Sequence, residues 1–347
     1  MQELKRIINY KRIILLLIAA TVNVVFFLYD NKPVMDEDII NKENVAHETY
    51  IKNYHEEVNA IIDNADKLKK YSIFNKAGSF SYANILQTAR DFERVKNVIL
   101  PEDEYKGVQA YTTYYYQYFF TMLVMMFVIY DMFAQRDNGM WSITYSCANG
   151  RIMYAIKQTG VIVVTGAFTH TLIYWSTFIA AMLQRGGVRD LVNPVQTIET
   201  FDKFTYPWSK IKYVTVLYLI SMVCIVALCI TIWGVFVMFR NRVYALVTML
   251  IFAAVEQFIY SHIDIHSVWN GLHYINIINI ININATFSSY RNWGVGTYVF
   301  PVFSVVLFVH IICAGVIGYI AINVSASMKP YKNTTFIKRF TDCVSSG

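Results

Sequence analysis

Charged residues are scarce in this sequence. They make up 16% of its 347 residues, against about 25% in a typical soluble domain. Cysteine is scarce too, and the five cysteines form no CxxC pair and no regular spacing, which excludes a disulfide scaffold and a standard zinc module. Hydrophobic residues, in contrast, supply 56% of the chain. This balance excludes a disordered or fibrous protein, argues against a simple soluble enzyme and indicates a membrane protein.

The sequence also lacks the common catalytic motifs. It contains no HExxH and no GxSxG pattern, and its apolar segments hold no paired carboxylates at helical spacing. A GxxxxGK[ST] phosphate-binding loop is missing as well. We therefore expect no catalytic residues, no cofactor and no ATP bound through such a loop.

Six apolar segments are long enough to cross a bilayer as helices, which takes about 20 residues. They cover residues 13–29, 114–134, 158–183, 213–239, 243–261 and 297–322. The first follows a basic start, as in a signal peptide, but no small-x-small cleavage site follows it, so we interpret it as an uncleaved anchor. The sequence predicts an all-α, polytopic membrane protein with six transmembrane helices.

Basic residues predict how these helices are oriented. Thirteen lysines and arginines fall on the side of the two chain ends, and six fall in the two short loops on the other side. Because basic residues in short loops favour the cytoplasm, we expect a multi-pass protein of the cell membrane with both termini cytoplasmic. The predicted parts are then the cytoplasmic N-terminus and first helix (1–29), an extracytoplasmic helical domain (30–112) and the other five helices with a cytoplasmic tail (113–347).

Apolar residues within 30–112 recur in steps of three and four, which predicts two amphipathic helices packed as a hairpin. The two seams consist of Ile51, Tyr54, Val58, Ile61, Ala65 and Leu68, and of Tyr82, Ile85, Ala89, Phe92 and Ile99. Ser81 is the predicted cap of the second helix. This domain is either a spacer, the simpler interpretation, or a docking site for a partner or substrate.

Residues 262–296 connect the fifth and sixth segments and contain an unusual run made only of Ile and Asn over 275–284. This run is too apolar for a free loop and too short for a seventh span, so we predict a re-entrant or interfacial helix. His262 and His266 share a helix face and form a candidate metal pair. The favoured interpretation is interfacial polar residues without metal, because no further ligand stands at a diagnostic spacing.

The turn between the second and third segments carries an aromatic residue, a glycine, an arginine and, six positions later, a lysine. These residues are Phe133, Gly139, Arg151 and Lys157. The pattern resembles the membrane subunits of ABC type-2 transporters, the permeases of drug, peptide and polysaccharide exporters. Gln135 stands where that family usually has Glu, which keeps the hydrogen-bonding reach but removes a salt bridge. Trp141 belongs to the short amphipathic helix expected over 139–150.

The resemblance extends to the topology, because the family has six spans, both termini inside and an outer re-entrant element between spans five and six. It implies a permease that moves an amphiphilic or peptide-like substrate out of the cytoplasm or inner leaflet. The implied partners are a separately encoded ABC ATPase subunit, a second permease in a homodimer or heterodimer, and membrane lipids, with no nucleic acid. The implied ATPase-coupling residues lie in segment 134–157 and next to it: Phe133, Gln135, Gly139, Trp141, Arg151 and Lys157. The alternatives are an ordinary cytoplasmic turn and, for the whole chain, a membrane sensor or scaffold that binds an extracellular ligand through its outer hairpin.

Polar residues inside apolar segments are costly and invite functional hypotheses. His170 and Glu256 are candidates for lining a translocation path between two protomers. The other interpretation is that a neighbouring helix satisfies each side chain, which we favour for His170 and consider equally strong for Glu256. Asp131 lies close enough to the end of its segment to reach the inner interface. Small residues in the sixth segment, Ala314, Gly315 and Gly318, are expected to permit close helix contact.

Overall fold

The computed structural model describes residues 10–33, 36–71, 76, 78–101, 106–137, 150–239, 241–264, 267 and 269–327. Within this part, six helices are long and apolar enough to cross a membrane. They are α2 (Tyr10–Asp30), α6 (Tyr116–Asp137), α8 (Gly150–Arg185), α9 (Lys210–Met238), α10 (Arg242–His262) and α14 (Val302–Ser327). The prediction of a mainly helical, multi-pass membrane protein is therefore confirmed.

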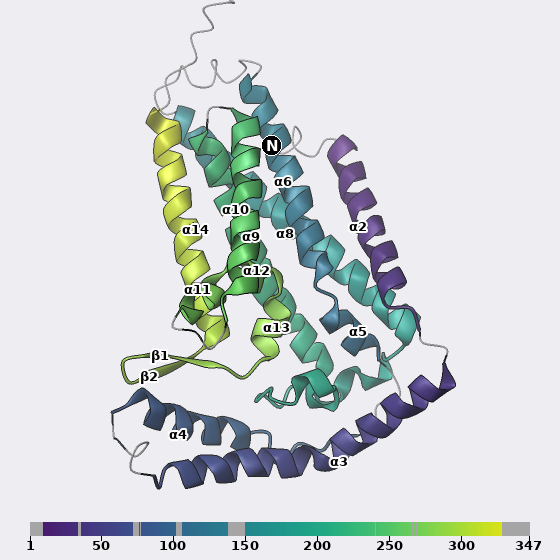
Figure 1. Ribbon diagram of the computed structural model, residues 1–347. Helices are drawn as coiled ribbons and strands as arrows, with labels where there is room; N and C mark the ends of the chain where they lie inside the picture. Colours follow the sequence, from purple (N-terminus) through teal and green to yellow (C-terminus); the bar gives the residue numbers. More distant parts are fainter. Residues whose placement is uncertain are drawn as a thin grey trace, which may run out of the picture.

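The six helices run in alternating directions and form one bundle (Figure 1). One end of the bundle carries the start of α2 and the end of α14, and we call it the terminal end. The opposite end carries the long connection between α2 and α6, and we call it the hairpin end. Helix α9 lies at the centre, where it contacts α6, α8, α10 and α14. Burial follows this arrangement: 61% of an apolar 18-residue stretch of α9 is buried, whereas only 6% of the corresponding stretch of α10 is buried.

Helices α9 and α14 approach closely at small residues. A Cβ added to Gly234 of α9 would overlap the Ile317 side chain of α14. Ala314 is 3% exposed, and a Cβ added to Gly318 would lie 3.1 Å from Ile230. The expected contact role is thus confirmed for Ala314 and Gly318. It is wrong for Gly315, because nothing lies within 4 Å of an added Cβ there.

At the hairpin end, α3 (Glu37–Leu68) and α4 (Phe80–Glu93) lie across the bundle (Figure 1). They pack through a small apolar core of Tyr54, Val58, Phe92 and Val95. The cap of α4 differs from the prediction, because the Ser79 side chain, not Ser81, accepts a hydrogen bond from the backbone N–H of Tyr82. A cap must stand outside the helix with extended backbone angles, and Ser79 has φ −86° and ψ 149°.

Short elements complete the hairpin end. Helix α5 (Gly107–Thr113) precedes α6, and three 3₁₀ turns follow α8. These turns are η1 (Arg189–Val192), η2 (Val195–Thr197) and η3 (Glu199–Phe201). The Tyr50 hydroxyl of α3 donates to the backbone oxygen of Gln196 at 2.7 Å. This bond ties the long helix to the bundle.

The segment between α10 and α14 is more broken than the sequence indicates. It forms three short helices and a two-stranded antiparallel hairpin: α11 (Asn270–Ile275), α12 (Ile277–Ile281), α13 (Ile283–Ser288), β1 (Asn292–Val295) and β2 (Tyr298–Pro301). Asn276 interrupts the helix because its side chain caps α12 through the Ile278 N–H. The strands turn at Gly296, whose φ of +63° suits glycine.

The segment differs in detail from the re-entrant or interfacial helix predicted within 262–296. Three short helices stand in its place, and a small β-hairpin is added to a chain that is otherwise helical. The sixth span also begins at Val302 rather than at residue 297. Residues 298–301 belong to β2 because their aromatic and β-branched side chains pair with β1 in register, with Asn292 opposite Pro301.

Candidate functional site

Four of the six predicted coupling residues are described, and they lie at the terminal end, where α6 ends and α8 begins. Phe133 is fully buried in α6, and its ring centroid lies 5.6 Å from that of Phe236 in α9. Gln135 belongs to the last turn of α6. Gly139, Trp141 and all but the last residue of the short helix expected over 139–150 lie outside the described residues. Phe133 therefore connects the end of α6 to the central helix.

Helix α8 begins earlier than its apolar segment does. Its 36 residues from Gly150 give a length of roughly 54 Å at 1.5 Å per residue, against about 30 Å of bilayer hydrocarbon. Arg151 and Lys157 consequently lie in the first turns of a continuous helix rather than in a turn before it, which corrects the prediction. The Arg151 guanidinium donates to the backbone oxygen of Ala326 near the end of α14 at 3.4 Å, and Lys157 is exposed.

Two further basic residues hold the terminal end together. Arg12 of α2 forms an ion pair with Asp131 of α6, and its Nε also donates to that carboxylate at 3.2 Å. Asp131 therefore has a partner inside the protein as well as a largely exposed side chain. Arg242 at the start of α10 lies over the Tyr130 ring, 4.5 Å from its centroid. Arg12 thus connects α2 to α6, and Arg242 connects α10 to α6.

His170 lies in the packed interior between α6, α8 and α9. The residue is 1% exposed, and its Nε2 lies 2.8 Å from the Ser221 hydroxyl. The rings of Tyr118 and Tyr218 stack on it at centroid distances of 5.9 and 5.8 Å. Its hydrogen bond and its aromatic neighbours satisfy this imidazole within the bundle.

Glu256 binds the backbone of the segment that follows α10. Its Oε2 accepts a hydrogen bond at 3.0 Å from the backbone N–H of Ile277, which is the first residue of α12. The Glu256 backbone oxygen accepts from the Asn276 side chain at 2.7 Å. A carboxylate is favourable at a helix N-terminus, where N–H groups have no partner in the helix. Glu256 therefore fastens α12 to α10, whereas the His170 imidazole lies beside Ser221 of α9.

Only His262 of the candidate metal pair lies within the described residues. The His262 Nδ1 lies 2.9 Å from the Ser261 hydroxyl, and its ring stacks on Phe258 with centroids 4.1 Å apart. His266 lies outside the described residues. Across the residues that the structure describes, no group of three or more His, Cys, Asp or Glu side chains could hold a metal ion.

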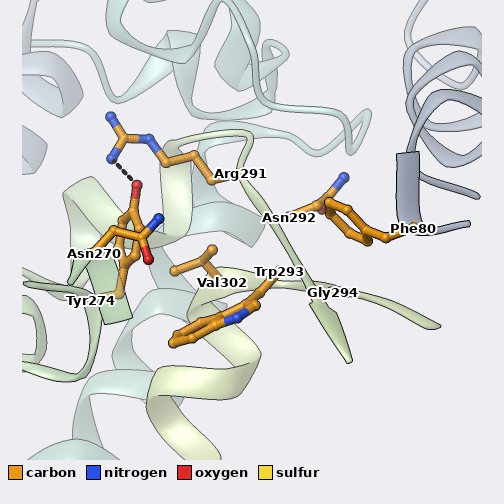
Figure 2. Close-up of a pocket in the computed structure, with 8 residues that line it drawn as sticks. All are labelled: Phe80, Asn270, Tyr274, Arg291, Asn292, Trp293, Gly294 and Val302. Atoms are coloured by element: carbon orange, nitrogen blue, oxygen red, sulfur yellow. Dashed lines mark hydrogen bonds between the residues drawn. The ribbon is translucent and has the colours of Figure 1, made fainter. Parts of the chain in front are cut away.

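A pocket of about 430 Å³ at the hairpin end was not predicted from the sequence. Four separate elements and the turn before β1 line it (Figure 2): Phe80 of α4, Asn270 and Tyr274 of α11, Arg291, Asn292, Trp293 and Gly294, and Val302 of α14. Among these eight residues only Arg291 is charged. The available signal was the arginine itself, flanked by Tyr290 and Trp293 in a short loop, because Arg among aromatic residues is enriched at binding surfaces.

Comparisons of this chain with protein-family models, with curated proteins and with solved structures yield no match. The comparisons therefore identify no family. The resemblance of residues 133–157 to ABC permeases remains a hypothesis based on the motif and the topology.

Proposed function

We propose that this protein is the membrane-spanning permease of an ABC exporter. Two permease copies, identical or different, move an amphiphilic or peptide-like substrate outward with ATP hydrolysed by a separate subunit. The terminal end faces the cytoplasm, α3 and α4 lie outside the cell membrane, and α11 to α13 form the re-entrant element. The observation that carries this proposal is the continuous helix α8. Its first turns contain Arg151 and Lys157 and precede the apolar segment that suits a bilayer.

A helix of this length can transmit movement from outside the bilayer into the bundle. Ala155 and Gln158 of α8 are buried, whereas Lys157 between them is exposed. The start of α8 is bonded to the end of α14 through Arg151, and farther along α8 packs against α9. A push on the exposed face near Lys157 would therefore reach three helices, since packed helices shift as units.

Helix α10 provides the surface for lipid or a second copy. Only 6% of its apolar 18-residue stretch is buried within this chain, and Tyr244, Ile251 and Phe258 are each at least 60% exposed. Glu256 links this helix to α12. A displacement of α10 at a dimer interface would therefore move the short helices α11 to α13, which suits a gate on the outer side.

Purification from native membranes in a mild detergent tests the proposal. We expect a nucleotide-hydrolysing protein to accompany the wild-type chain. Lys157→Glu should lower its recovery several-fold, because it reverses the charge of an exposed side chain at the proposed contact. Lys67→Glu is the matched control, since Lys67 is an exposed lysine of α3 at the opposite end.

If no such protein accompanies the wild-type chain, or if Lys157→Glu and Lys67→Glu lose it equally, the permease proposal is contradicted.

The alternative, a membrane sensor or scaffold, is favoured by the pocket that Phe80 of α4 helps to form. That function predicts purification without an ATPase and complete loss of activity when α3 and α4 are deleted.

A further inference from the structure

We propose that the pocket at the hairpin end binds an anionic amphiphile, a molecule with one carboxylate or phosphate headgroup on an apolar chain. The pocket is separate from the predicted coupling residues, and binding there does not require ATP-driven transport. Its lining combines the charge of Arg291, polar groups beside it and apolar side chains (Figure 2).

Arg291 supplies an uncompensated positive charge. Its guanidinium donates one hydrogen bond to the Tyr274 hydroxyl at 3.2 Å, and within the described part of the chain no carboxylate pairs with it. A guanidinium has five N–H donors arranged as a fork that matches carboxylate and phosphate oxygens. Most of these donors remain for a ligand. The pocket therefore favours an anion.

Backbone and side-chain groups hold Arg291 in place and add polarity. The Arg291 backbone oxygen accepts from the Val302 N–H at 2.9 Å, which joins the arginine to the first residue of α14. The start of this 26-residue helix adds a favourable field for negative charge, with no acidic residue in its first turn to oppose it. The side-chain amide of Asn270 also borders the pocket. Arg291 is thus a positioned cation.

The rest of the pocket is apolar. Trp293, Val302 and Phe80 form its wall, and Phe80 packs so closely on β1 that a Cβ added to Gly294 would overlap its ring. Large apolar side chains on the neighbouring surface are also exposed: Trp269, Leu272, Val295, Tyr298 and Phe300. An acyl chain fits this combination better than a fully polar anion does, because it would cover exposed apolar surface.

The site lies where a bilayer amphiphile can reach it. Val302 is the first residue of an apolar helix long enough to cross the membrane, and α11 and the β-hairpin lie at the same end of that helix (Figure 1). Trp269, directly before α11, and Tyr298 and Phe300 of β2 are exposed aromatic residues. Aromatic side chains favour the headgroup region of a bilayer. A headgroup at Arg291 would therefore stand at the level where lipid headgroups normally lie.

The test measures lipid binding to the purified full-length protein in neutral detergent, by native mass spectrometry. The probes are oleate, phosphatidylglycerol, phosphatidylcholine and inorganic phosphate. We expect the wild type to prefer one or both anionic lipids over phosphatidylcholine by about tenfold, the effect of one charge-assisted contact. The oleate and phosphatidylglycerol arms distinguish a free fatty acid from a phospholipid.

Arg291→Gln should abolish this preference, and Arg189→Gln should keep it, because Arg189 is an exposed arginine of η1 outside the pocket. Asn270→Trp fills the pocket without changing the charge and should weaken binding of anionic lipid, which provides a second test if Arg291→Gln misfolds. An unchanged preference in Arg291→Gln, or an equal loss in Arg189→Gln, would overturn the proposal. Release of bound lipid by inorganic phosphate as effectively as by oleate would also overturn it, because the site would then recognise a soluble anion.

Discussion

Asp91 of α4 shows how a single buried charge holds the hairpin end together. The residue is 7% exposed and accepts hydrogen bonds from the Gln87 side chain at 2.9 Å and from the Tyr290 hydroxyl at 3.0 Å. It also pairs with Arg94 at 3.1 Å. A buried carboxylate needs such partners to offset its lost hydration. The Tyr290 partner is 199 positions away, so the sequence pattern within α4 does not reveal it.

Replacing Asp91 should loosen the junction between α4 and the segment before β1. Asp91→Ala removes the charged acceptor of the Tyr290 hydroxyl and leaves it only Thr88 Oγ1 at 3.3 Å. We expect a loss of about 1–3 kcal/mol in the free energy of unfolding. Scanning fluorimetry in detergent measures this as a lower thermal midpoint. Glu93→Ala is the control, since Glu93 is an exposed acid of the same helix. Equal midpoints for the two variants would contradict the assigned role.

Tyr290 should make the same junction sensitive to alkali. Burial raises the pKa of its hydroxyl from 10.0 to about 12. The folded state therefore favours the neutral hydroxyl, and this contribution to stability is complete below pH 10 and is lost as the pH rises toward 12. We expect the thermal midpoint of the wild type to fall more steeply across this range than that of Tyr290→Phe. Parallel curves would show that Tyr290 is not the titrating group.

At the scale of elements, hydropathy locates the six long helices well but not their ends. The apolar pattern detects the part of α8 that suits a bilayer, but it misses the first turns of the helix, which begins at Gly150. The helical hydrogen bonds continue there although the residues are no longer mainly apolar. Side-chain caps at Ser79 and Asn276 depend on backbone angles that composition does not encode. Predictions of small residues in α14 succeeded where the helix faces α9 and failed at Gly315, since the sequence does not identify the partner helix.

The contact between α9 and α14 gives a test at this scale. Gly234→Val would place a side chain where Ile317 already lies, so we expect a loss of about 1–3 kcal/mol from overpacking. Gly315→Val is the matched control because its added atoms meet open space. The thermal midpoint in detergent should fall for Gly234→Val only. A similar fall for both variants would show that helix propensity, not contact, determines the effect.

At the scale of the whole molecule, the sequence predicts a six-helix membrane protein and leaves the pocket unseen. The pocket residues come from α4, α11, the strand region and α14, and only the folded chain brings them together. The candidate path residues illustrate the same limit. His170 and Glu256 are both polar residues in apolar segments, yet one is enclosed by tyrosines and the other caps α12. Neighbours from other elements determine what each polar group does.

The orientation of the bundle underlies the proposed coupling of α8 to a cytoplasmic ATPase. Two single-cysteine proteins test it, one retaining only Cys147 between α6 and α8, the other carrying only Ser81→Cys on the exposed face of α4. A membrane-impermeant maleimide should label Ser81→Cys in intact cells and Cys147 only after permeabilisation. Labelling of Cys147 in intact cells, with Ser81→Cys protected, would place the start of α8 outside the cell and contradict the permease.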